Sequence, residues 1–176
     1  KYMIANAYYY CTAAEFLAIT PQRVGSKRYA RLQYEWIAAA VKLYEECATR
    51  GLGIAIPNLV DILRTGRHGA PIQQQKAKNY IHIGAQMGIG AYERIVGNEY
   101  RDDNELGRAV ELYERAILHK DDYAYYCLGR LYTYGGALPL DLKKALSYLE
   151  KGYEKLPDDA GFCNLLGEIY FRGGEG

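Results

Sequence analysis

An all-α solenoid of about nine helices, built from stacked helix-turn-helix repeats, is the fold that this sequence predicts. Two short motifs alternate along the chain, and copies of each recur at intervals of 32 to 38 residues. In both motifs apolar and small residues stand three and four positions apart, which is the spacing of one helical face. Self-similarity at a period of roughly 20 to 50 residues is typical of repeat proteins, in which each unit buries its apolar side against the next.

The first motif is an alanine followed by a tyrosine three or four residues later. Its four copies are Ala40 with Tyr44, Ala77 with Tyr80, Ala109 with Tyr113, and Ala145 with Tyr148. We expect each copy to lie on one helix of a hairpin, alternating with a helix that carries the second motif.

The second motif has the pattern Leu-Gly-x2-Tyr. Its copies begin at Leu128 and Leu166, with a close copy at Val96 and a weaker copy from Leu59 to Leu63. A glycine inside a helix costs roughly 1 kcal/mol in helix propensity. That cost is offset only where a second helix approaches the backbone closely, so we expect close helix contacts at Gly97, Gly129 and Gly167.

Tyrosine is the unusual feature of the composition, with 19 Tyr against 3 Phe and 1 Trp. Tyrosines at recurring motif positions are expected to fill gaps beside the close helix contacts, with their hydroxyls reaching the solvent edge. These packing tyrosines are Tyr80, Tyr100, Tyr113, Tyr132, Tyr148 and Tyr170. Tyr126, Tyr134 and the run from Tyr8 to Tyr10 remain as the tyrosines to test for binding.

Three pairs of aspartates stand close to expected helix starts. Asp121-Asp122 and Asp158-Asp159 precede helices of the Leu-Gly motif, and Asp102-Asp103 precedes a helix of the Ala-Tyr motif. An aspartate at a helix N-cap typically contributes about 1 kcal/mol. We therefore expect capping at these pairs rather than metal binding.

The paired motifs resemble Sel-one-like repeats, a helical-hairpin family related to tetratricopeptide repeats. Residues 124–152 match that family's pattern nearly throughout, at Ala124, Leu128, Gly129, Tyr132, Gly135, Asp141, Lys144, Ala145 and Tyr148. The resemblance implies a right-handed α–α superhelix whose first helices line a concave recognition surface. One branch of the family carries a disulfide in each repeat, and the cysteines here do not have the spacing which that branch requires.

The motifs divide the chain into five predicted segments. An N-terminal helical hairpin, a divergent or capping repeat, covers residues 1–53, and a helix is expected over residues 2–18. Complete repeats follow at 54–89, 90–121 and 122–157. Residues 158–176 form the first helix of a further repeat, from which we expect the chain to be cut from a longer array.

No pattern of catalytic or metal-binding residues is found. The four cysteines and three histidines lack zinc spacing, and the glycines near Gly88 lack the lysine and serine or threonine of a phosphate loop. We therefore predict that the chain is not an enzyme and that it binds no metal or cofactor. The unpaired cysteines favour a cytoplasmic location.

The candidate binding surface consists of the positions between the structural Gly and Tyr residues of the Leu-Gly helices. These candidates are Asp61, Arg64, Arg94, Asn98, Arg101, Tyr126, Arg130, Tyr134, Asn164 and Glu168. Their mixture of charged, amide and aromatic groups suits a peptide or a partner helix, because Arg and Tyr are common hot spots of interfaces.

The predicted function is therefore a non-enzymatic adaptor that binds a protein or peptide. With 22 basic against 21 acidic residues the net charge is +1, which argues against a nucleic-acid binder. No apolar run is long enough to insert into a membrane. Two alternatives stay open: a structural segment of a larger signalling or secretion-related protein, and a cell-wall or β-lactam binding or hydrolysing protein.

Overall fold

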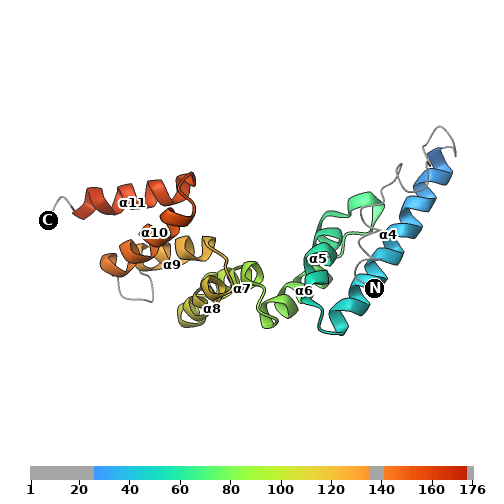
Figure 1. The fold of residues 1–176 in the computed structure, drawn as a ribbon, viewed down its shortest axis with the longest axis horizontal. Helices are drawn as coiled ribbons and strands as arrows, with labels where there is room; N and C mark the ends of the chain where they lie inside the picture. Colours follow the sequence, from blue (N-terminus) through green and yellow to red (C-terminus); the bar gives the residue numbers. More distant parts are fainter. Residues whose placement is uncertain (1–25, 135–140, 174–176) are drawn as a thin grey trace. The chain divides into compact units, whose positions relative to one another are not determined.

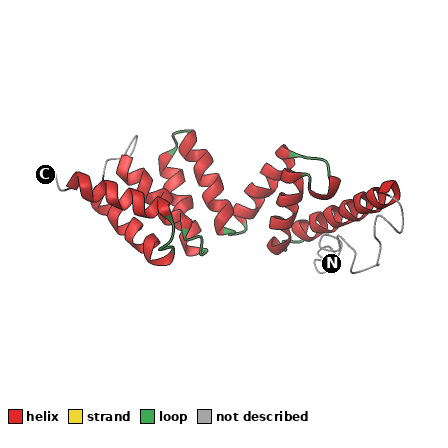
Figure 2. Ribbon diagram, turned by 90° about the horizontal axis from the view of Figure 1, so that it is seen from above, coloured by secondary structure: helices red, strands yellow, loops and turns green. Residues whose placement is uncertain are grey.

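The computed structural model describes residues 26–134 and 141–173. Within these residues it contains eight α-helices and no strand, and short loops join the helices (Figures 1 and 2). The all-α fold of successive helical hairpins is confirmed, and the number of helices is close to the predicted nine. The helix expected over residues 2–18 and the run from Tyr8 to Tyr10 lie outside the described residues.

The first of two compact units covers residues 1–87. Its α-helices are α4 (Ser26–Thr49), α5 (Ile56–Thr65) and α6 (Gln74–Gln86), with 3-10 helices at Gly53–Ala55 and Arg67–Gly69. Helix α5 packs against α4 on one side and against α6 on the other. The motif residues Ala40, Tyr44, Leu59 and Ala77 meet in the core of this unit, as the repeat pattern predicts.

The second unit covers residues 88–176. It contains α7 (Gly90–Asp102), α8 (Leu106–Leu118), α9 (Tyr123–Tyr134), α10 (Leu142–Lys155) and α11 (Ala160–Gly173). Each helix packs against the next along the chain, and α9 also contacts α11. The Leu-Gly motif therefore lies on α7, α9 and α11, and the Ala-Tyr motif lies on α8 and α10.

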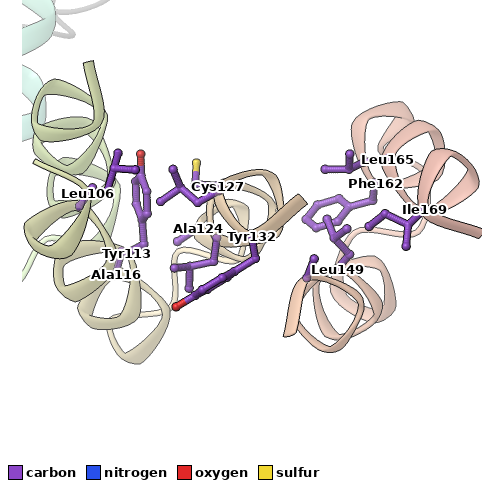
Figure 3. Packing of buried hydrophobic residues seen from close by; sticks show 14 residues of the cluster. Leu106, Tyr113, Ala116, Ala124, Cys127, Tyr132, Leu149, Phe162, Leu165 and Ile169 are labelled. Atoms are coloured by element: carbon purple, nitrogen blue, oxygen red, sulfur yellow. The ribbon is translucent and has the colours of Figure 1, made fainter. Parts of the chain in front are cut away.

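A continuous apolar core runs through the second unit from α8 to α11 (Figure 3). Tyr113 and Ala116 of α8 meet Ala124 and Cys127 of α9, and Phe162 of α11 extends the same cluster. The hydroxyl of Tyr113 and the sulfur of Cys127 point to one side of this layer, while the hydroxyl of Tyr132 points to the other (Figure 3).

Two of the three mid-helix glycines make the close contact that was expected. A Cβ at Gly97 would lie 2.7 Å from Cε1 of Tyr113, and a Cβ at Gly129 would overlap the side chain of Leu149. The prediction was wrong for Gly167, because no heavy atom of the described residues lies within 4 Å of a Cβ built there. The open space at Gly167 reflects the absence, among the described residues, of a helix that packs on this side of α11.

The hydroxyls of Tyr148 and Tyr170 reach the exposed edges of helix contacts, as expected, whereas Tyr113 is buried. Four tyrosine hydroxyls donate hydrogen bonds to side chains of other helices. These bonds are Tyr113 to Asn98 (2.8 Å), Tyr134 to Glu168 (2.7 Å), Tyr148 to Glu114 (3.0 Å) and Tyr170 to Glu150 (2.8 Å). The ring spans the gap between two helices, so its hydroxyl can bond to an acceptor on the far helix at the edge of the contact.

The aspartate caps were predicted correctly at two of the three pairs. Asp121 Oδ1 accepts from the backbone N–H of Tyr123 at 3.2 Å, and Asp159 Oδ1 accepts from that of Gly161 at 2.8 Å. The prediction was wrong for Asp102-Asp103, which end α7 instead of capping α8. The chain turns at Asn104, which has a φ of 62°, and α8 begins only at the buried Leu106.

Candidate protein-binding face

Eight of the ten candidate residues lie on the three Leu-Gly helices of the second unit. Helix α7 carries Arg94, Asn98 and Arg101; α9 carries Tyr126, Arg130 and Tyr134; α11 carries Asn164 and Glu168. We call the surface that they form the α7–α9–α11 face. The contacts described below link α7 to α9 and α9 to α11 along it.

Arg94 joins α7 to the start of α9. Its Nε lies 2.8 Å from Oδ2 of Asp121, and its guanidinium lies over the ring of Tyr123 at 5.3 Å from the centroid. Both partners of the ion pair are mostly buried, with side-chain exposures of 23% and 10%. Because Asp121 also caps α9, Arg94 holds the first turn of that helix in place.

Asn98 and Arg101 form one polar cluster with Tyr113. The Oδ1 atom of Asn98 accepts from the Tyr113 hydroxyl at 2.8 Å and from Nη1 of Arg101 at 3.2 Å. Arg101 also contacts the carboxylate of Asp102 at 2.8 Å. Burial raises the pKa of Tyr113 above its usual value, so the hydroxyl stays protonated as a donor to Asn98.

Cys127 lies beside this cluster, with its Sγ 4.0 Å from Oδ1 of Asn98. Burial raises the pKa of the thiol to about 11, and the nearby Arg94, Arg101 and Arg130 counteract only part of that rise. A thiol of this kind is protonated at neutral pH, so Cys127 acts as a core residue and not as a nucleophile.

The centre of the face is aromatic. The Tyr126 ring lies 5.3 Å from that of Tyr123 and meets that of the fully buried Phe162 edge-on at 5.5 Å, and the rings of Tyr123 and Phe162 also meet edge-on at 6.3 Å. The guanidinium of Arg130 lies over Tyr126, 5.9 Å from its centroid. Arg130 is exposed, and no carboxylate of the described residues forms an ion pair with it.

Tyr134 and Glu168 connect α9 to α11. The Tyr134 hydroxyl donates to Oε2 of Glu168 at 2.7 Å, while Nη2 of Arg172 lies 2.5 Å from Oε1 of the same carboxylate. The bond to Glu168, followed by burial, raises the pKa of Tyr134. Sequence reasoning missed Arg172, although its position four residues after Glu168 is the usual signal of a helical ion pair. Asn164 is exposed on α11.

The two remaining candidates lie on α5, in the first unit. Oδ2 of Asp61 lies 3.2 Å from Nη1 of Arg67, and the side chain of Arg64 is exposed.

Among solved structures, two have a similar fold. One is a Sel1 repeat protein from Oxalobacter formigenes, which is 22% identical with a TM-score of 0.63 over 98% of this chain and 76% of that chain. The other is c5321, a protective antigen of uropathogenic Escherichia coli strains, which is 20% identical with a TM-score of 0.64 over 97% of this chain and 40% of that chain. The chain has the Sel1-repeat fold. No protein-family model and no curated protein matches it.

The Sel1-repeat fold of this chain also contains an apolar hollow that sequence reasoning missed. The hollow lies in the first unit and measures about 160 Å³, with Tyr34, Ile37 and Val41 of α4 on one side and Leu63 and Pro71 on the other. These residues come from three separate segments, so no local sequence pattern marks the site.

The described part of this Sel1-repeat fold holds neither a cluster of metal-ligand residues nor a helix that could span a membrane. No group of three or more His, Cys, Asp or Glu residues there could hold a metal ion. None of the described helices combines the length and the apolar character needed to cross a bilayer.

Proposed function

We propose that this chain is a non-enzymatic protein-interaction module that binds a peptide or a partner helix on the α7–α9–α11 face. Stacked helical hairpins present extended surfaces that are commonly used for binding, and the Sel1-repeat fold is of this kind. The observation that carries the proposal is the pair formed by Tyr126 and Arg130, which lies at the centre of the face.

Tyr126 is held in place before any partner binds. Its ring is half-buried against Phe162, so it has lost part of its side-chain freedom, and the guanidinium of Arg130 lies over that ring. Ordering a flexible side chain at an interface costs about 0.5–1.5 kcal/mol, and that cost is smaller for a side chain that is already held. Tyr and Arg are also the residue types that most often dominate interface energies.

The other candidates act mainly as supports in this proposal. Arg94 and Asn98 hold α7 against α9 and α8, and Tyr134 with Glu168 holds α9 against α11. They fix the spacing of the three helices and so position Tyr126 and Arg130 for the partner.

The test starts from a display library of random 12-residue peptides selected on the whole chain. Binding of the selected peptides is then measured by calorimetry with Tyr126→Ala and with Tyr153→Ala. Tyr153 is a matched control because it is a partly exposed tyrosine, 40% exposed, on α10. We expect Tyr126→Ala to weaken binding at least about tenfold, as at an interface hot spot, and Tyr153→Ala to change it little. A library without binders, or peptides that bind both variants like wild type, would contradict the proposal.

A further inference from the structure

We infer that the partner segment is acidic and places a carboxylate on Arg130, beside an apolar side chain that lies against Tyr126. This inference rests on the proposed function and adds the chemistry of the partner to it.

Most of the arginines on the face are already paired with carboxylates. Four arginines lie on α7, α9 and α11, and three of them already contact a carboxylate. These pairs are Arg94 with Asp121, Arg101 with Asp102, and Arg172 with Glu168. Arg130 lies over the Tyr126 ring and forms no ion pair among the described residues, so its charge is the one among these four arginines that no carboxylate of the described chain compensates.

Arg130 lies close enough to Cys127 to act on the same thiol as two arginines of α7. Arg94, Arg101 and Arg130 come from two helices, and all three act on the thiol of Cys127 by favouring its charged form. The sulfur of Cys127 lies on the same side of the core layer as the Tyr113 hydroxyl, which bonds to Asn98 of α7 (Figure 3). All three guanidinium groups therefore act on the same part of the face, and since Arg94 and Arg101 are already paired with carboxylates, a carboxylate of the partner gains mainly from Arg130.

A guanidinium can bind a carboxylate and an aromatic ring at the same time. A guanidinium presents paired N–H donors that match the two oxygens of a carboxylate, and its flat face can rest on an aromatic ring at the same time. In this structure the guanidinium carbon of Arg130 lies over the Tyr126 ring, 5.9 Å from its centroid. The ring of Tyr123, which is 37% exposed, lies next to Tyr126 and offers apolar surface to the residue beside the partner's carboxylate.

A peptide fits this face better than a nucleic acid does. The carboxylates of Asp102, Asp121 and Glu168 are interleaved with the arginines, and a continuous row of phosphates would meet them as well as the cations. Nucleic-acid binding gains affinity from many phosphate contacts to unpaired cations, and the net charge of +1 does not supply them. A single carboxylate needs only one cation, and Arg130 is the arginine of this face that no carboxylate of the described residues pairs.

The experiment uses the same 12-residue display library on the whole chain, and scores how often Asp and Glu occur in the selected peptides. The best peptide and a copy with Asn and Gln in place of Asp and Glu are then titrated by calorimetry into wild type, Arg130→Gln, Arg130→Glu and Lys143→Glu. Lys143 is an exposed lysine on α10, so Lys143→Glu makes the same charge change away from the face. A fluorescent single-stranded DNA 20-mer is titrated in parallel.

We expect acidic residues to be enriched, and the neutral peptide to bind wild type at least about tenfold more weakly, as for a lost charge-assisted hydrogen bond. Arg130→Gln and Arg130→Glu should bind the acidic peptide more weakly by a similar factor and the neutral peptide almost as wild type does. Lys143→Glu should bind both peptides like wild type.

Two results would overturn the inference and leave the proposed function standing. One is that the selected peptides show no excess of acidic residues. The other is that their binding is weakened by Tyr126→Ala but unchanged by Arg130→Glu. Peptides indifferent to both Tyr126→Ala and Arg130→Glu would overturn both. DNA binding that is lost in Arg130→Glu would replace the acidic peptide with a nucleic acid.

Discussion

Oε2 of Glu93 lies 2.6 Å from Nδ1 of His119, across the hairpin formed by α7 and α8. The Glu93 side chain is fully buried, and its other oxygen lies 2.7 Å from Nη2 of Arg115 on α8, whose C-cap is His119. A buried carboxylate is tolerated only where cations or donors compensate it. The side chains of Arg115 and His119 are partly exposed to solvent, and each places a nitrogen atom against one oxygen of the Glu93 carboxylate.

Arg115→Ala is expected to lower the free energy of unfolding by about 2–4 kcal/mol, because it leaves the buried carboxylate of Glu93 with one partner fewer. Adding Glu93→Gln in the same chain should restore part of that loss, since the neutral amide needs no cation. Urea unfolding of the single and double variants measures both effects. The control is Arg108→Ala on the same helix, which breaks the exposed ion pair with Glu105 and should cost no more than about 1 kcal/mol. Equal losses at Arg115 and Arg108 would refute this account of Glu93.

The mid-helix glycines provide a matched comparison. Gly129→Ala should destabilise the chain by about 1–3 kcal/mol, because the new methyl group overlaps the buried side chain of Leu149. Gly167→Ala should leave stability unchanged or raise it by up to about 1 kcal/mol, because the space is open and alanine favours the helix. Thermal unfolding of the two variants decides between these expectations, and a destabilised Gly167→Ala would show that another segment covers α11.

Much of the fold could be predicted because small residues mark where helices touch. Gly97 and Gly129 identified two close helix contacts from sequence alone, and the Ala-Tyr copies located the second helix of each hairpin. The pairing of Arg94 with Asp121 could not be predicted, since 27 residues separate them and their meeting depends on the register between α7 and α9. Local capping rules also failed at Asp102, because the turn at Asn104 intervenes before α8 begins.

The tyrosine hydroxyls are expected to contribute to stability as well as to packing. Tyr113 is fully buried, and its bond to Asn98 joins α8 to α7. Tyr113→Phe should cost about 1–2 kcal/mol, because it removes one hydrogen bond and leaves Arg101 to satisfy the Asn98 oxygen. Tyr153→Phe, on an exposed position of α10, should cost almost nothing. If denaturant unfolding finds both variants equally stable, the hydroxyl bond contributes nothing measurable.

Alkaline pH is expected to destabilise the second unit through Cys127. Its thiol has a pKa of about 11 in the folded chain, mainly because it is buried, against an ordinary value of 9.0. Between these values the unfolded chain has released the proton while the folded chain still holds it. The contribution of this thiol to the free energy of unfolding is therefore fully present below pH 9 and is lost as the pH rises towards 11. One such group lowers the free energy of unfolding by at most about 1.4 kcal/mol per pH unit.

Urea midpoints at pH 8, 9, 10 and 11 should fall less steeply in Cys127→Ala than in wild type, whatever the stability of the variant at pH 8. Because burial also raises the pKa of Tyr113, some decline should persist above pH 10 in Cys127→Ala. Parallel curves for wild type and variant would mean that the thiol is not the group responsible.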